Sequence, residues 1–111
     1  MDNWIKGLPC AFTVCDKTGI VIDMNVNAEK IFESDGGRAL IGTNLIDCHP
    51  EPSRTKLKDM LAGEVTNTYI IENNGKKKII HQSPWYDNGE YKGFVEISFE
   101  LPDNMPHFIR S

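Results

Sequence analysis

Two Asn-Gly dipeptides in the C-terminal half constrain the fold more than any other feature of this sequence. They lie at Asn74-Gly75 and Asn88-Gly89, and each separates two strand-like runs. Asn-Gly between such runs is the strongest short-range signal for a β-hairpin, because both residues readily adopt positive φ. We therefore expect three consecutive strands, paired as an antiparallel meander, in "TNTYIIE", "KKIIHQSPWY" and "YKGFVEISFEL".

The N-terminal half predicts a further hairpin followed by short helices. The run "CAFTVC" stops at the turn signal "DKTG" and "IVIDM" resumes as a strand, so residues 11–24 are expected to form a hairpin. Asn25 or Asn27 can cap a short helix that ends at Gly36-Gly37. A second helix over "EPSRTKLKDMLAGE" is indicated by apolar residues at helical spacing, Leu57, Met60 and Leu61.

This order of elements predicts an α+β fold, with one antiparallel sheet, short helices on one face and a hollow between them. The length of 111 residues fits a single domain, and the net charge of −4 argues against nucleic acid as a partner. No stretch approaches the ~18 apolar residues of a membrane span, and the N-terminus is a poor export signal. We therefore expect a cytoplasmic protein that does not bind a membrane, with reduced cysteines.

Two segments of the chain resemble the PAS family of sensory domains. "DKTGIVIDMNVNAEKIF" is similar to the family's opening pattern of an Asp-x-x-Gly turn, a strand, and Asn before a short helix. "YDNGEYKGFVEISFEL" is similar to its final hairpin with Gly-x-x-x-Gly spacing, and the "DCHP" passage is similar to a bacterial subgroup. Val26, where the family often has proline, and the absence of a terminal Asp-Ile-Thr triplet depart from the pattern.

The resemblance implies a five-stranded antiparallel sheet in the order 2-1-5-4-3 and a role in sensing or protein association, often as a homodimer. Family members bind haem, flavin, small carboxylates or no detectable ligand, so the cofactor stays unknown. We expect an N-terminal cap over residues 1–8, a PAS-like domain over 9–102 and a tail over 103–111 that lies on the surface. Because the sequence ends at Ser111, any output is expected to act on a separate signalling partner protein.

The passage "NLIDCHPEPSR" places a thiol and an imidazole just before the second helix. Adjacent side chains in an extended segment point to opposite sides, so Cys48 and His49 do not form a nucleophile pair. In one reading Cys48 is a small buried apolar group and His49 donates to a nearby carbonyl. In the other, either residue lines the cavity, or ligates a haem or metal.

The run "IIHQSPWY" offers a second set of candidates. Alternation puts His81, Ser83 and Trp85 on one face, and if that face meets the helices it offers an imidazole, a hydroxyl and an indole to the hollow. In the alternative reading His81 is only a cross-strand polar residue. Pro84 indicates an edge position or a bulge. The residues expected to bind a ligand are Cys48, His49, His81, Ser83 and Trp85, with Phe32 and Leu45 as apolar walls.

No metal site is predicted, because no zinc spacing with four ligands is present. His49 and His81 are the candidate ligands if a haem or metal is held, and a convergence of both with Cys48 and a water would suit zinc or iron. An enzyme is not expected, since the acidic residues lie mainly in turns and no activated nucleophile is evident.

A modest dimer interface is predicted at the N-terminal segment and the last strand. Val95, Ile97, Phe99 and Leu101 form one apolar face of that strand, whereas Phe94 stands among polar residues on the other. That polar face suits solvent or a weak association. The residues expected at the interface are Trp4, Ile5, Leu8 and Phe94. The predicted function is a stand-alone sensory module that binds a small ligand or cofactor in the hollow, with haem as one candidate; the alternative is a ligand-free association domain.

Overall fold

The computed structural model describes residues 1–111 and contains one five-stranded sheet in the order β2-β1-β5-β4-β3. The strands are β1 (Ala11–Asp16), β2 (Val21–Met24), β3 (Asn67–Asn73), β4 (Lys76–Asp87) and β5 (Glu90–Glu100). The helical segments are α1 (Asn3–Lys6), α2 (Val26–Ile31), η1 (Glu33–Asp35), η2 (Gly37–Leu40), α3 (Leu45–Cys48) and α4 (Ser53–Gly63). None of these helices combines the length and apolar character needed to cross a membrane.

The three predicted hairpins and the predicted strand order are confirmed. All four neighbouring strand pairs are antiparallel. Asn74 and Asn88 adopt φ of 53° and 51°, and the glycine that follows each also has positive φ. The Asn-Gly turns therefore fix the registers of β3, β4 and β5, as their sequence indicates.

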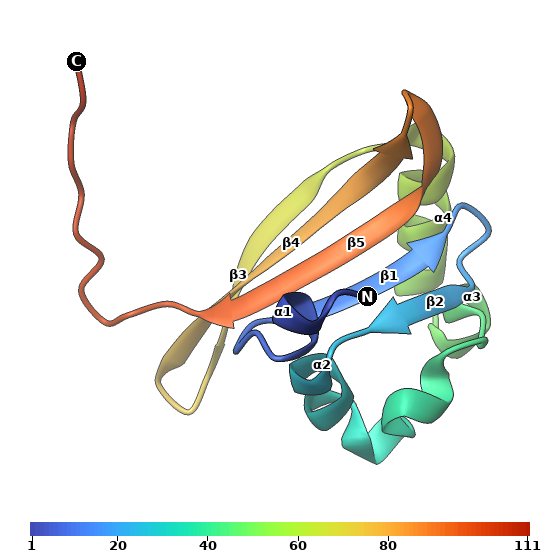
Figure 1. The fold of residues 1–111 in the computed structure, drawn as a ribbon, viewed down its shortest axis with the longest axis horizontal. Coiled ribbons are helices and arrows are strands. Elements are labelled where there is room, and N and C mark those ends of the chain that lie inside the picture. Colours follow the sequence, from blue (N-terminus) through green and yellow to red (C-terminus); the bar gives the residue numbers. More distant parts are fainter.

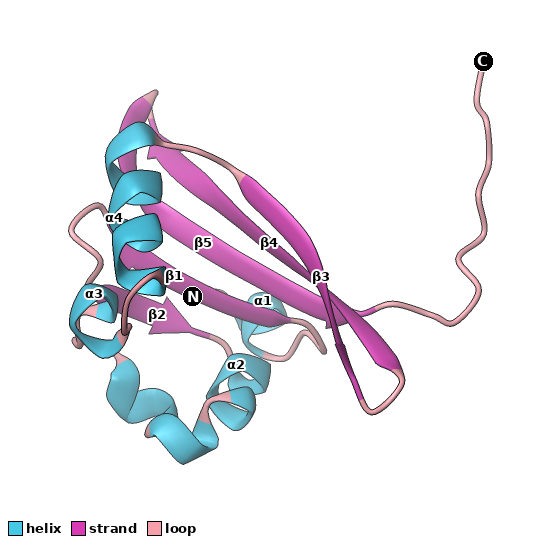
Figure 2. Ribbon diagram, turned by 180° about the vertical axis from the view of Figure 1, so that it is seen from behind, coloured by secondary structure: helices cyan, strands magenta, loops and turns pink.

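The helices divide unequally between the two faces of the sheet (Figures 1 and 2). The face covered by α2, the 3₁₀ segments, α3 and α4 is called the inner face below, and the opposite one the outer face. α1 lies on the outer side, where the Met1 amino group is 3.3 Å from Asp23 Oδ2. The helices after α1 thus confirm the prediction of short helices on one face, whereas α1 belongs to the N-terminal segment of residues 1–8 that was expected to form a separate cap.

The C-terminal tail does not lie on the surface, contrary to the prediction. After Leu101, whose N–H donates to Lys77 O, the chain is irregular and extends away from the sheet (Figure 1). Phe108 and Ile109 are 70% and 92% exposed. Pro102 and Pro106 do not let this segment continue the ladder of β5, because proline supplies no N–H.

Asn25 is the main polar anchor of the N-terminal half. Its side chain is fully buried; Oδ1 accepts from Phe12 N (3.0 Å) and Ala28 N (3.1 Å). Nδ2 donates to Ile5 O (3.0 Å) and Cys10 O (2.7 Å). This one amide therefore caps α2, as predicted for Asn25 or Asn27, and joins the helix to β1 and to the segment after α1.

The prediction that Phe94 lies on a surface is wrong. Phe94 is 6% exposed and packs in a core cluster with Cys15, Met60 and Leu61. Its face of β5 is the inner one, and the apolar residues Val95, Ile97 and Phe99 point to the outer side. Of the polar residues that share the face of Phe94, Glu96 lies on the floor of a cavity, Ser98 is buried and Glu100 is exposed.

Candidate functional site

A cavity of about 480 Å³ lies between the inner face of the sheet and the helices, within the size range of small-molecule sites. Most of its walls are apolar. The helical side supplies Phe32, Leu40, Leu45, Cys48, His49, Leu57 and Met60, with Asp35. The sheet supplies Thr13, Cys15, Val21, Met24, Gln82, Phe94 and Glu96, and also Val95, although strand alternation puts the Val95 side chain on the outer face.

Three polar residues on the floor of the cavity, Thr13, Glu96 and Gln82, belong to a row that crosses the sheet and ends at Asn67 on β3, outside the cavity lining. Strand pairing places Thr13 opposite Glu96, Glu96 opposite Gln82, and Gln82 opposite Asn67. Asn67 Nδ2 donates to Gln82 Oε1 (3.1 Å), and Gln82 Nε2 donates to Glu96 Oε1 (2.9 Å). These four residues are called the polar row below.

His49 belongs to the roof of the cavity and follows α3 directly. Its Nδ1 is 2.6 Å from Leu45 O, and a carbonyl oxygen can only accept, so Nδ1 carries the proton. Nε2 is then the free ring nitrogen. The local fold supports this geometry because Asn44 Oδ1 accepts from Ile46 N and caps α3. Both readings of His49 therefore hold together: it donates to a nearby carbonyl and lines the cavity.

The two cysteines of the cavity have different settings. Cys15 is buried in the floor, and burial raises the pKa of its thiol, partly offset by a hydrogen bond with the Phe94 backbone. Cys15 thus stays a neutral, weakly polar wall at neutral pH. Cys48 is exposed at the cavity rim, so the prediction of a small buried group is wrong for this residue.

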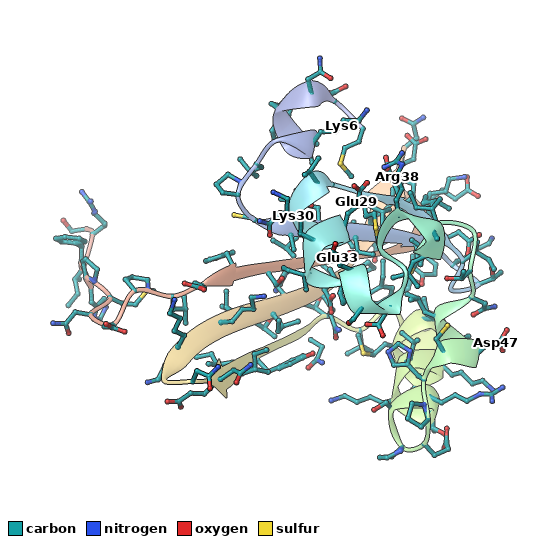
Figure 3. All side chains as sticks on the ribbon, turned by 90° about the horizontal axis from the view of Figure 1, so that it is seen from below. Lys6, Glu29, Lys30, Glu33, Arg38 and Asp47 are labelled. Atoms are coloured by element: carbon teal, nitrogen blue, oxygen red, sulfur yellow. The ribbon has the colours of Figure 1, made fainter.

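The C-terminal end of α4 is attached to the β4–β5 hairpin by two tyrosines. Tyr91 Oη donates to Leu61 O (2.8 Å), and burial raises the pKa of Tyr91, which keeps this donor protonated. Tyr86 Oη donates to Glu64 Oε1 (3.0 Å), a hydrogen bond that raises the pKa of Tyr86. Arg38 Nη1 is 2.5 Å from Glu29 Oε1, an ion pair that joins η2 to α2, whereas the Asp47 side chain points outward from the protein (Figure 3).

No family model matches this sequence, and no curated protein matches it. Solved structures do. A C-terminal domain from Streptococcus mutans has a TM-score of 0.69 at 20% identity, with 86% of this chain and 78% of that chain covered. The PAS domain of BvgS from Bordetella pertussis has a TM-score of 0.62 at 18% identity, covering 89% and 82%. Aer2 from Vibrio cholerae, a dual PAS-haem oxygen sensor, has a TM-score of 0.59 at 17% identity, covering 84% and 95%.

The chain has the PAS fold. The five-stranded order and the PAS neighbours confirm the fold that the two quoted segments indicate. At these identities the likeness concerns the backbone architecture, so the chemistry of this PAS cavity has to be derived from its own side chains.

Four of the predicted binding residues meet in the PAS cavity: Phe32, Leu45, Cys48 and His49. The prediction that His81, Ser83 and Trp85 also face it is wrong, since these alternate with the inner residues Ile80 and Gln82. His81 Nδ1 is instead 2.8 Å from Thr68 Oγ1, which fits the reading of a cross-strand polar residue. Ser83 Oγ donates to Pro84 O, and Trp85 Nε1 donates to Cys15 O.

Pro84 fits both parts of its prediction. β3 begins opposite Gln82, so Pro84 has no partner on that side and its missing N–H breaks no ladder bond there. An irregularity between Trp85 and Tyr86 follows at once.

Sequence reasoning missed the cavity residues Thr13, Gln82 and Glu96. Polar residues that alternate with apolar ones on central strands are the signal that could have found them.

A haem does not fit the lining of the cavity. His49 offers a free Nε2 with its other nitrogen fixed, which suits an axial ligand. Haem also carries two propionates, yet no lysine or arginine lines the cavity, and Glu96 and Asp35 would oppose them. His81 lies on the other face of the sheet, so it joins neither His49 nor Cys48, and no three His, Cys, Asp or Glu residues are grouped to hold a metal ion.

Proposed function

We propose that this chain is a sensory module that binds a small organic molecule in its cavity and signals to a separate partner protein. The cavity of about 480 Å³ with apolar walls and a polar row on its floor is the observation that supports this function. The PAS neighbours, among them an oxygen sensor, are consistent with it.

α4 is suited to pass the ligand state to the surface. Leu57 and Met60 line the cavity, and the hydrogen bonds of Tyr91 and Tyr86 hold the C-terminal end of the helix. The residues that begin α4, Ser53 to Lys56, are exposed. A ligand that contacts Leu57 and Met60 can therefore shift the exposed N-terminal end of α4, by an amount set by its differential affinity for the two positions.

We expect native mass spectrometry of the protein, purified from its source cells, to detect a bound organic molecule. Leu57→Trp should reduce the bound fraction at least about tenfold, because the larger ring occupies the cavity and clashes with the ligand. Lys58→Trp is the matched control, since Lys58 is exposed on the same helix. An unliganded wild-type protein would instead favour the second candidate, an association domain that binds no ligand.

The outer face favours self-association. It presents Val95, Ile97 and Phe99 on the central strand, and Phe99 is 40% exposed. Trp4 on α1 is 66% exposed beside it, whereas Ile5 and Leu8 are half-buried. A second copy of this chain that packs against this surface would cover Trp4 and the apolar side chains together, and we propose a homodimer of this kind with Phe94 excluded from the interface.

Trp4→Ala should weaken this homodimer about thirtyfold, because a buried tryptophan at an interface contributes about 2 kcal/mol or more. Light scattering over a concentration series measures the change. Ile109→Ala, which alters a 92% exposed apolar residue of the tail, is the control and should leave the dimer intact. A wild-type protein that is monomeric at every concentration would refute the proposed interface.

A further inference from the structure

The polar row determines which class of molecule the cavity accepts, and this step depends on the proposed ligand-binding function. Its orientation follows from one residue. If the Gln82 amide were reversed, its oxygen would face the oxygen of Glu96, so the carboxylate requires Nε2 at 2.9 Å. Gln82 Oε1 is then left to accept from Asn67. In both hydrogen bonds the donor amide therefore points toward Glu96, and the Glu96 carboxylate is the final acceptor of the row.

Glu96 has no cation beside it. The three ion pairs of the protein involve other residues, and the Gln82 amide is the only side-chain donor to its carboxylate. One carboxylate oxygen is therefore free in a half-buried position on the central strand. A carboxylate in mostly apolar surroundings without a positive partner is unfavourable, so a donor or cation that reaches it gains more than it would in water.

The rest of the cavity lining also carries no positive charge from lysine or arginine. Asp35, exposed at the rim, is the other charged residue. Thr13 Oγ1, directly opposite Glu96, makes no hydrogen bond within the protein and is free to orient a bound group. His49 Nε2 adds an acceptor when the ring is neutral. The cavity is therefore rich in acceptors and would repel an anion.

From this arrangement we infer that the ligand is a small organic cation with an apolar body, such as an amine, an amidine or a protonated nitrogen heterocycle. Its N–H groups donate to the free oxygen of Glu96, Thr13 orients the same group, and the apolar body packs against Leu45, Leu57 and Met60. A carboxylate ligand of the same shape is excluded by Glu96.

Three probes that differ only in their polar end test this inference: phenylbutylamine, phenylbutanol and phenylbutyrate. Each is titrated to millimolar concentration while backbone amide signals of β4, β5 and α4 are followed by NMR. We expect the amine to bind most tightly, the alcohol more weakly, and the acid to leave the signals unchanged. Glu96→Gln should weaken binding of the amine by about tenfold or more, the effect of losing one charged hydrogen bond. It should change the affinity for the alcohol by no more than about twofold.

Glu100→Gln is the matched control, because Glu100 lies on the same strand and is exposed outside the cavity. It should leave the amine affinity unchanged. The inference is overturned, with the proposed function intact, if phenylbutyrate binds as well as the amine, or if Glu96→Gln and Glu100→Gln have equal effects. If none of the three probes shifts any signal, the ligand-binding function itself is wrong.

Discussion

Asn25→Ala is expected to lower the free energy of unfolding by about 3–5 kcal/mol, a large part of the ~5–15 kcal/mol typical of a domain this size. The substitution leaves the N–H groups of Phe12 and Ala28 and the carbonyls of Ile5 and Cys10 without the partners that the amide provides. Asn25 is fully buried, so water does not replace these partners without opening the structure. Urea denaturation measures the loss.

Two further variants separate the causes. Asn25→Asp has the same shape and retains the acceptor for Phe12 and Ala28, but it places a carboxylate against two carbonyl oxygens. We expect it to be nearly as destabilising as the alanine variant. Asn27→Ala changes a neighbouring, half-buried asparagine without a side-chain hydrogen bond, and its effect should stay below about 1 kcal/mol. A mild effect of Asn25→Ala would mean that the N-terminal segment is not anchored through this amide.

Local signals were sufficient to predict most of the fold. The two Asn-Gly turns, the "DKTG" turn and the cap at Asn25 each depend on a backbone conformation that few residues adopt, so the sequence carries them directly. The packing of Met60 and Leu61 of α4 follows from helical spacing in the same way.

The faces of the last two strands could not be predicted by the same reasoning. Alternation separates two sets of residues on β5, but it does not say which set meets the helices. The rule that the more apolar set is buried chose Val95, Ile97 and Phe99, and it failed because this inner face supports a cavity with Gln82 and Glu96 on its floor. The expectation that His81 and Trp85 line the cavity depended on which face of β4 meets the helices, and alternation alone left that open.

His49 shows how far a sequence can identify a site residue. Its place before α4 put it near the cavity, and the structure agrees. Its Nδ1 bond to Leu45 O depends on the short helix α3, which a four-residue apolar cluster does not reveal. The candidate site was therefore correct in its helical half and wrong in its sheet half.

The floor of the cavity depends on the close approach of β1 and β5, and Gly93 permits that approach. Gly93 has φ of 153° and is paired with Asp16 and Trp85. A Cβ at this position would overlap the Cys15 carbonyl oxygen and lie 2.7 Å from Asp16 Cα. Backbone atoms of a central strand pair do not move aside at small cost, and the neighbouring Trp85 Nε1 bond to Cys15 O would be lost with them.

Gly93→Ala is therefore expected to destabilise the protein by more than about 4 kcal/mol, or to prevent folding at 37 °C. Gly89→Ala, in the turn of the same hairpin, is the matched control: its φ is 79°, and nothing lies within 4 Å of its added Cβ. That variant should lose only about 1 kcal/mol, the cost of positive φ alone. Urea denaturation of both variants separates overlap from backbone strain, and equal losses would show that β1 and β5 are not pressed together at Gly93. Because Cys15 and Phe94 adjoin this contact and line the cavity, any Gly93→Ala protein that does fold should also bind the amine probe more weakly than the Gly89→Ala protein.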